Sequence, residues 1–474
     1  MFALPSRSGP SLAARFAGLA IGLGSLLGSA PALANGAFPA VSQLVADPGD
    51  PTHLVLRSNF GLLTSRDQGN TWDLVCEAGM GYQNEEPAIA VLGNGTTIAG
   101  LSTGVAHGAA NECDFSLGTG VTGYVLDVTR VPGTQADAVA VSVDFDDDTS
   151  QVWHTSDGGA SWRAWGVALD AFDAATIEIT SDDVLYVSGL SQADTVKGVL
   201  ARSSDEGKTW SRFDVPSTSS DSAPYIAAVA GDDSDTLYVR LSGSPGRLLG
   251  SHDGGQHFED LLDFTGPFDG FALSPDGRYA LASGRSDGVW RAPTSTLSFE
   301  QLSCEQLRCL SWTDAGLFAC AYEFEAGFLV GQSSDLGQSF QPLLHMSCVR
   351  GPLACAADSS VGQTCGAAWP MISDQLGTDC ASAATFVPRT DCLAKGGAGG
   401  LAGSTASGSA GASFGTGSTR TGSGGSESVT RPHGGGCSFA RTPAGPRAWL
   451  AVLVPLAWLI RRRIGTQRPG ALLE

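Results

Sequence analysis

The sequence predicts an all-β chain built on a seven-bladed β-propeller, and three observations lead to this fold class. A short turn pattern, Ser/Thr-x-Asp-x-Gly-x-x-aromatic, occurs five times. The Asp residues of consecutive copies are 48 residues apart twice, from 157 to 205 and from 205 to 253. Short β-rich runs, separated by turn residues, fill the sequence between the copies. A repeat of roughly 40–50 residues with several short strands is typical of propeller blades.

The turn pattern also gives the number of units. Its Asp residues are Asp67, Asp157, Asp205, Asp253 and Asp335. The gaps from 67 to 157 and from 253 to 335 are nearly twice the single spacing, which predicts one degenerate copy in each gap. Ala110 and Thr294 take the Asp position in these two copies. We therefore expect seven blades over residues 37–345.

Each part of the pattern has a physical role in a hairpin turn. The Asp carboxylate can accept backbone N–H groups across the turn, the Gly supplies a positive φ, and the aromatic residue anchors the next strand. The pattern resembles the Asp-box, or BNR, repeat of sialidases and related propellers. This resemblance implies that the boxes lie between the third and fourth strands of each blade and hold hairpins together.

The resemblance does not extend to the chemistry of sialidases. That family uses an arginine triad and announces its first arginine with Phe/Tyr-Arg-Ile-Pro, whereas the corresponding region here reads Leu54-Val-Leu-Arg57-Ser58. The sequence also lacks HExxH and P-loop motifs, and no GxSxG nucleophile elbow between a strand and a helix is predicted. We assign the five box Asp residues a structural role and assign no catalytic residue. Enzymatic activity is left open, with its absence favoured; glycoside hydrolysis is the activity to test.

Residues 1–34 are predicted to form a signal peptide. Arg7 and Arg15 supply positive charge before an apolar stretch over 16–27, and Ala32-Leu33-Ala34 matches a cleavage site. The eleven cysteines are then expected to form disulfides, as in other exported proteins. A zinc site is the alternative, but there is no CxxC pair.

One cysteine, Cys437, belongs to the end of the chain, and an even number remain. These are Cys76, Cys113, Cys304, Cys309, Cys320, Cys348, Cys355, Cys365, Cys380 and Cys392. Cys76 and Cys113 lie near the first two boxes, so a Cys76–Cys113 bond would staple two blades. The others are expected to tie the last blades to a Cys-rich tail over residues 346–392.

Residues 393–436 are rich in Gly, Ser and Thr and are expected to form a disordered linker. The segment 437–474 then contains Cys437, a short apolar helix over 448–460 and the cluster Arg461–Arg463. This order of parts resembles the MYXO-CTERM sorting signal of myxobacteria, which implies processing at Cys437 and anchoring at the surface of a Gram-negative, myxobacterium-like cell. The Arg cluster also fits the positive-inside rule, and an ordinary membrane anchor is the alternative.

The charge of the chain limits its partners. With 27 Lys and Arg against 48 Asp and Glu, the formal net charge is −21, so we expect no nucleic-acid partner. We expect no cofactor. The acidic run Asp144–Asp148 offers oxygen ligands that would suit Ca²⁺, but it lacks the Gly and the distal Glu of an EF-hand loop, and a solvated turn is the favoured interpretation.

The loops between successive blades are the expected binding face, because a rigid scaffold presents variable loops there. The candidate ligand-binding residues are Tyr82, Glu85, Glu86, Tyr225 and Asp269. Aromatic and acidic side chains together suit a basic or polar peptide, or a sugar, although each aromatic residue could instead anchor the core. The sequence favours a monomeric, non-catalytic surface protein that binds a protein or glycan. A sialidase-like exo-glycoside hydrolase and an envelope assembly scaffold are the alternatives.

Overall fold

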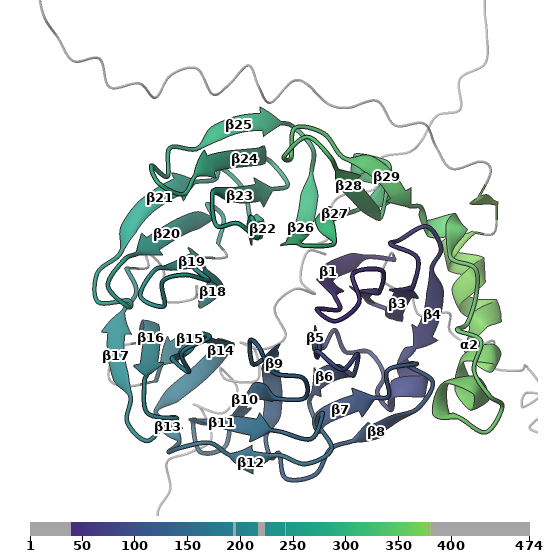
Figure 1. Ribbon diagram of the computed structural model, residues 1–474, viewed down its shortest axis with the longest axis horizontal. Coiled ribbons are helices and arrows are strands. Elements are labelled where there is room, and N and C mark those ends of the chain that lie inside the picture. The colour runs from purple at the N-terminus through teal and green to yellow at the C-terminus, as the bar shows by residue number, and fades with distance from the viewer. Residues whose placement is uncertain (1–38, 193–195, 217–222, 242, 378, 381–474) are drawn as a thin grey trace, which may run out of the picture. The chain divides into compact units, whose positions relative to one another are not determined.

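The computed structural model describes residues 39–192, 196–216, 223–241, 243–377 and 379–380. The expected signal peptide, the linker, the segment that begins at Cys437, and Cys392 lie outside these residues. Seven antiparallel sheets form blades around a central axis (Figure 1). The chain is mostly strand with few helices, and the seven-bladed propeller predicted from the repeat is confirmed.

Each blade consists of four strands that follow one another in the chain, with the first strand nearest the axis. Blade 1 contains β1 (Val41–Ala46), β2 (Leu54–Ser58), β3 (Gly61–Ser65) and β4 (Asp73–Cys76); blade 2 contains β5 (Ala88–Val91), β6 (Thr97–Leu101), β7 (Gly104–Gly108) and β8 (Phe115–Leu117). Blade 3 contains β9 (Tyr124–Arg130), β10 (Ala138–Asp144), β11 (Thr149–Thr155) and β12 (Arg163–Ala164), with β13 (Leu169–Asp170) also paired to β11.

The other four blades repeat this order. Blade 4 contains β14 (Phe172–Ile179), β15 (Leu185–Ser191), β16 (Lys197–Ser203) and β17 (Ser211–Asp214); blade 5 contains β18 (Pro224–Val229), β19 (Leu237–Leu241), β20 (Arg247–Ser251) and β21 (Glu259–Asp263). Blade 6 contains β22 (Phe268–Leu273), β23 (Tyr279–Gly284), β24 (Gly288–Pro293) and β25 (Glu300–Ser303); blade 7 contains β26 (Leu307–Thr313), β27 (Gly316–Ala321), β28 (Val330–Ser333) and β29 (Gln341–Leu344).

The second strand of each blade is apolar on both faces because the neighbouring blades cover it on both sides. β10 and β15 are buried along almost their whole length, whereas the rim strands β17 and β21 are largely exposed. The apolar contacts between blades form the core, which buries large side chains such as Trp72, Tyr186 and Phe318. Burial of such side chains between sheets is the main stabilising term of the fold.

The first strands carry a β-bulge in every blade except blade 2, and side chains at these bulges connect neighbouring blades. The Ile177 N–H donates to Asp127 Oδ2 at 3.0 Å, and the Ile226 N–H donates to Thr176 Oγ1 at 2.9 Å. The Gln43 amide makes the corresponding pair of bonds to the backbone of Ile89. A backbone N–H on the inner edge strand of one blade thus finds its acceptor in the preceding blade.

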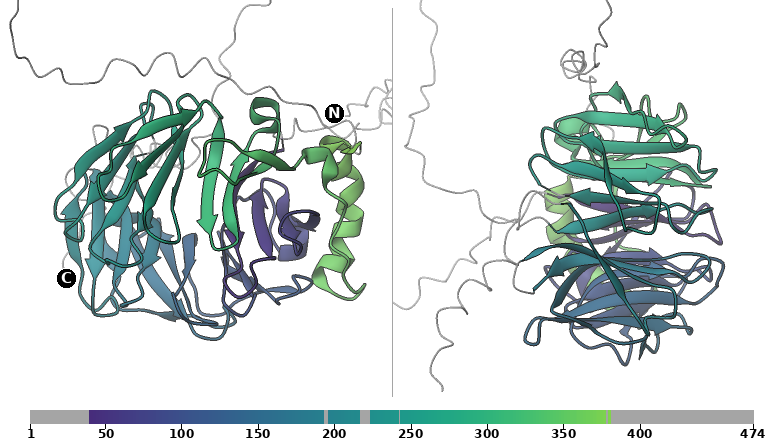
Figure 2. Two further views of the ribbon diagram at one scale, coloured as in Figure 1. Left: turned by 45° about the horizontal axis from the view of Figure 1, so that its top comes forward. Right: turned by 90° about the vertical axis from the view of Figure 1, so that its left-hand side faces the viewer.

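The ring closes without exchange of a strand between the first and last blades, because each blade is one continuous stretch of chain. The tail after β29 instead crosses back onto blade 1. The Leu74 N–H donates to Gly351 O at 2.7 Å, and the Leu353 N–H donates to Leu74 O at 2.8 Å, so the tail adds a short parallel bridge to β4. Helix α2 (Ser360–Leu376) then lies along the outer side of blade 1 (Figures 1 and 2).

Two disulfides fix this tail to the ring. Cys76 pairs with Cys365, and Cys113 pairs with Cys355. The expected Cys76–Cys113 bond is therefore wrong: the two cysteines do staple the first two blades, but each does so through the tail that lies over them. The bonds Cys309–Cys320 and Cys348–Cys380 complete the described pairs, and Cys304 is also disulfide-bonded.

In blade 2 a buried glutamate stands at the glycine position of the box and belongs to a buried polar cluster. In complete boxes this Gly packs against the preceding blade, and a Cβ added at Gly255 would lie 2.3 Å from Leu200. Glu112 takes this place in blade 2 with φ of 55° and is fully buried. Its carboxylate accepts from Thr64 Oγ1 at 2.6 Å and lies 3.3 Å from Nε2 of the buried His53.

Within the described residues, no helix has the length and apolar character needed to cross a membrane.

Candidate functional site

The five box Asp residues all lie in turns between the third and fourth strands of their blades. In the first turn, Asp67 Oδ1 accepts the Thr71 N–H at 2.8 Å, Oδ2 accepts the Thr71 hydroxyl at 2.7 Å, and the Ser65 hydroxyl donates at 2.9 Å. The other four turns repeat this arrangement, with a His ring in place of the hydroxyl at position 257. Hydrogen bonds from Thr209 and Ser203 lower the pKa of Asp205 to about 2. These carboxylates are occupied by their own turns.

The loops between blades and the turns between second and third strands share one face of the ring, which we call the crossover face. All five candidate ligand-binding residues belong to elements of this face, but two of them have internal roles. Tyr82 is only 5% exposed and packs in the core, and burial raises its pKa. Glu85 accepts the backbone N–H and the hydroxyl of Ser102 at 2.9 and 2.7 Å, which fixes the turn after β6.

The other three candidates stand beside arginines. Glu86 is exposed and accepts a hydrogen bond from Ser42, which also accepts from Arg57 Nε at 3.0 Å. The Arg240 guanidinium lies over the Tyr225 ring at 4.8 Å. Asp269 Oδ2 accepts from Arg285 Nε at 2.9 Å.

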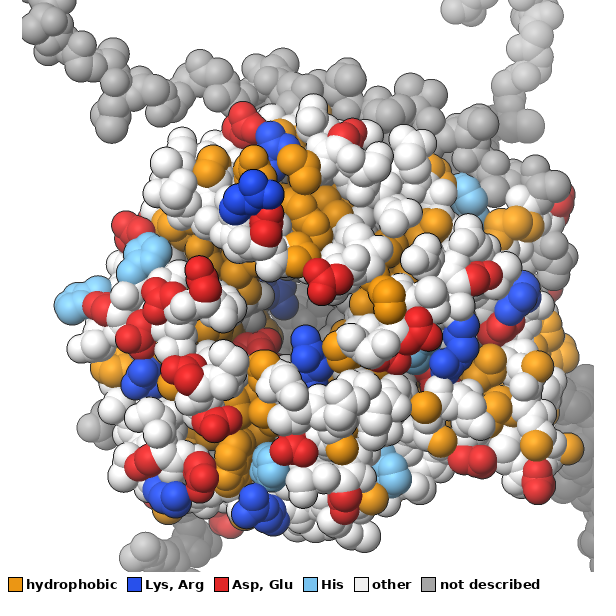
Figure 3. All heavy atoms as spheres, viewed as in Figure 1, with side chains coloured by type: hydrophobic (Ala, Val, Ile, Leu, Met, Phe, Trp, Pro, Cys, Tyr) orange, Lys and Arg blue, Asp and Glu red, His pale blue; other side chains and the backbone are white. Residues whose placement is uncertain are grey.

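Two of these arginines, Arg57 and Arg240, line the mouth of the central channel on the crossover face together with Arg308. Arg57 and Arg240 occupy the fourth position of β2 and β19. Arg308 is the second residue of β26, and its guanidinium lies 4.4 Å from the Tyr322 ring centroid. Burial lowers the pKa of Arg57, and the charges of Asp127 and Arg308 both act on it. Figure 3 shows basic and acidic side chains together around the central opening.

Two carboxylates lie on neighbouring inner strands within this channel. Asp127 is on β9, and its oxygen accepts the N–H of the residue that precedes Glu178 on β14. Burial raises the pKa of Asp127 to about 6. Burial, together with the negative charge of Asp127, raises the pKa of Glu178 to about 8. Burial therefore favours the protonated form of both carboxyls, and the charge of Asp127 favours it further at Glu178.

A pocket of about 470 Å³ opens on the crossover face between blades 6 and 7. It is lined by Pro267, Arg285, Ser286, Gln306 and Glu325. These residues come from two loops between blades, the turn after β23, and the short helix α1 (Glu323–Ala326). Asp269 holds Arg285 at its edge.

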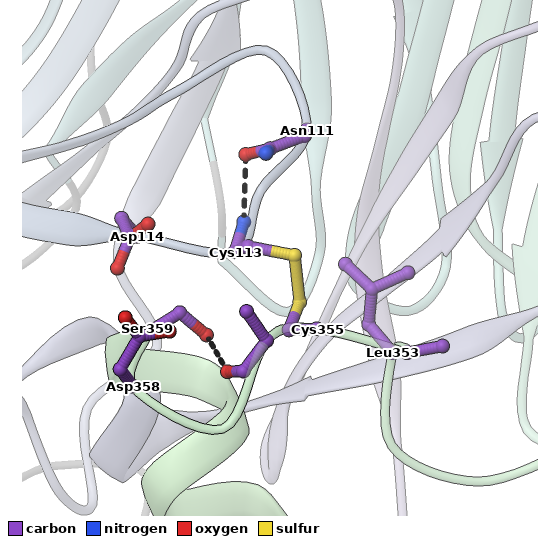
Figure 4. A pocket seen from close by; sticks show the side chains of 9 residues that line it. Asn111, Cys113, Asp114, Leu353, Cys355, Asp358 and Ser359 are labelled. Carbon is purple, nitrogen blue, oxygen red and sulfur yellow. Dashed lines mark hydrogen bonds between the residues drawn. A yellow bond between two sulfur atoms is a disulfide. The ribbon is translucent and has the colours of Figure 1, made fainter.

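A second pocket, of about 510 Å³, lies at the rim of the ring around the Cys113–Cys355 disulfide (Figure 4). Its polar atoms are bonded within the protein: Asn111 accepts from the Cys113 N–H, Ser359 donates to Ala356 O, and Asp114 accepts from the Ser360 N–H. This pocket is the seam where the tail joins blade 2.

The sequence did not single out Arg285, Gln306, Glu325, Asp127 or Glu178. The pocket gathers short segments that are distant in the chain, so no local pattern marks it. A usable signal existed for Arg57 and Arg240, because Leu54-Val-Leu-Arg57 and Leu237-Tyr-Val-Arg240 align in the repeat.

The acidic run Asp144–Asp148 forms an exposed turn between β10 and β11. Asp144 there accepts the N–H of Asp146 at 2.9 Å. In the described part of the chain, no three His, Cys, Asp or Glu side chains come together as a group that could hold a metal ion.

Comparisons with known proteins found distant likenesses among solved structures. No family model and no curated protein matches the chain. Among solved structures, an ancestral GH74 enzyme matches with a TM-score of 0.48 and 14% identity over 65% of this chain and 49% of that one. The extracellular domain of a hybrid two-component system from B. thetaiotaomicron matches with a TM-score of 0.44 and 13% identity, over 60% of this chain and 37% of that one. YCF48 bound to D1 peptide matches with a TM-score of 0.35 and 16% identity, over 49% of this chain and 71% of that one. The chain thus spans about half or less of the length of the first two structures.

Proposed function

We propose that this protein is an exported, non-catalytic binding propeller, anchored at the cell surface through its carboxy-terminal segment, that recognises a protein or glycan with its crossover face. The observation that carries this proposal is the gathering of arginines, carboxylates and aromatic rings on that face. Arg57, Arg240 and Arg308 surround the channel mouth, and the pocket between blades 6 and 7 lies beside it. Convergent polar groups in a concave site are the usual mark of a ligand site.

The disulfides support the exported location, since such bonds persist in oxidising compartments. The box carboxylates hold turns at the rim, away from the channel. A rigid ring of blades that presents variable loops on one face is suited to ligand recognition.

A binding screen tests the proposal. The mature protein, purified in its oxidised form, is applied to an array of glycans and to extracted surface proteins. We expect a ligand whose affinity falls at least tenfold in Arg57→Ala or Arg240→Ala, while Arg278→Ala in the exposed turn on the opposite face leaves it unchanged. Equal binding by all three variants would place the site elsewhere and contradict the proposal.

Glycoside hydrolysis is the second candidate, and the carboxyl pair Asp127 and Glu178 favours it. Two carboxyls whose surroundings separate their pKa values can act as base and acid at one site. If they do, fluorogenic glycosides, sialosides included, should be cleaved with a bell-shaped pH profile between about 6 and about 8. Asp127→Asn should then abolish turnover. No turnover of any glycoside would leave binding as the function.

A further inference from the structure

The pocket between blades 6 and 7 has the chemistry of a site for an uncharged polyhydroxylated ligand. We propose that it holds one ring of a neutral saccharide, an assignment that rests on the proposed binding function and names its ligand class. The first argument is volume: at about 470 Å³ the cavity falls within the usual range of roughly 300–1,000 Å³ for small-molecule sites.

The charges around the pocket favour a neutral ligand. Arg285 is the one basic residue in its lining, and its guanidinium is already paired with Asp269 at 2.9 Å. Glu325 adds a further negative charge to the wall. An anionic ligand would meet two carboxylates, and a Lys or Arg side chain would have to approach the Arg285 guanidinium, so both kinds of charge are disfavoured.

The hydrogen-bonding groups of the lining fit hydroxyls. Ser286 and the Gln306 amide each offer a donor and an acceptor, and Arg285 retains N–H groups beyond the one bonded to Asp269. Glu325 contributes a carboxylate acceptor to the same wall.

An aromatic platform lies next to this wall. Phe324 precedes Glu325 on α1, is 64% exposed, and stacks on Tyr322 with ring centroids 5.2 Å apart. Large rings exposed to solvent beside a polar pocket are well suited to stack on the C–H face of a sugar ring.

The test uses the mature, oxidised protein on one array that carries neutral, sialylated and uronic oligosaccharides together with peptides. We expect binding to neutral oligosaccharides. Gln306→Ala should weaken it by roughly 3- to 10-fold, the loss of one or two hydrogen bonds. Phe324→Ala should weaken it by a similar factor. Gln83→Ala, an exposed glutamine on the same face outside the pocket, should leave it within twofold.

Phe324 is exposed, so its loss does not threaten folding, and the thermal midpoint of each variant serves as the check. Preference for acidic glycans or for peptides would overturn the inference. So would neutral-glycan binding that depends on Arg57 and Arg240 but not on Gln306 or Phe324, although the proposed function would then stand. An array with no ligand of any class would overturn both.

Discussion

A carboxylate that already accepts several hydrogen bonds inside one turn has little left to offer a ligand. In the turn of blade 7, Asp335 accepts from the Ser339 N–H at 2.9 Å, from the Ser339 hydroxyl at 2.6 Å and from the Ser333 hydroxyl at 2.8 Å. The repeat that predicts the fold from the sequence therefore reflects a structural role of its Asp residues. The residues of the candidate site follow no such pattern.

The first prediction concerns this residue. Asp335→Ala should lower the free energy of unfolding by roughly 1–2 kcal/mol. The substitution removes the carboxylate acceptor of the turn and leaves the Ser339 N–H without its hydrogen-bond partner. Urea denaturation measures the change. Asp147→Ala, in the exposed turn between β10 and β11, is the control and should change stability little. An equal effect of the two substitutions would mean that the box carboxylate is dispensable, as it is in blade 2, where Ala110 takes its place.

The second prediction concerns the buried cluster of His53 and Glu112. Burial alone would lower the pKa of His53, but the Glu112 carboxylate, 3.3 Å from Nε2, and the hydrogen bond with Asp47 raise it above the ordinary value of 6.5, against a smaller opposing effect of Arg66. A raised pKa in the folded state means that the protonated ring stabilises the fold. That stabilisation is complete below pH 6.5 and is lost as the pH rises through the higher folded value.

The thermal midpoint of unfolding should therefore decrease as the pH is raised from 6 to 8.5. Glu112→Gln should remove most of this dependence and cost about 3 kcal/mol at pH 6, since it leaves a buried charge without its partner. Glu206→Gln, at an exposed ion pair with Lys208, is the matched control. The assignment fails if the variant keeps the pH dependence of the parent protein.

At the scale of elements, the sequence predicted the blades but not the way the ring closes. Blade number and turn positions follow from a repeat whose period is local, so they can be read along the chain. The path of the tail is a long-range property. Cys76 and Cys113 looked like partners because both stand near boxes, yet each bonds a cysteine more than 240 residues away. Cysteine spacing does not encode connectivity.

The third prediction compares two disulfides of very different span. The pair Cys76–Cys365 closes a loop of 289 residues, and Cys309–Cys320 closes one of 11. If a disulfide stabilises by restricting the unfolded chain, removal of the long-range bond should cost about 3 kcal/mol more than removal of the short one. Denaturation of the double Ser variants measures both losses. Equal losses would show that ring closure relies on the noncovalent contacts of the tail rather than on its covalent attachment.

At the scale of the whole molecule, the acidic chain still presents basic groups on one face. The chain carries a formal net charge of −21, yet Arg57, Arg240, Arg285 and Arg308 lie on the crossover face. The molecule as a whole repels polyanions, while one face offers guanidinium groups near carboxylates and aromatic rings. We therefore expect the crossover face to recognise its ligand through short-range contacts rather than to attract charged polymers from a distance.

The last prediction concerns how that face is displayed. We expect the mature protein to lack residues 1–34 and the cluster Arg461–Arg463, because the two ends resemble a signal peptide and a sorting signal processed at Cys437. Intact-mass measurement of the surface-labelled protein tests this. Cys437→Ala should retain Arg461–Arg463 and lose surface labelling, while Ser438→Ala should behave as the parent does. Recovery of the Arg cluster in the labelled parent protein would instead indicate an ordinary membrane anchor. The crossover face would still be presented outside the cell, but the chain would be held by its apolar segment rather than by a cleaved end.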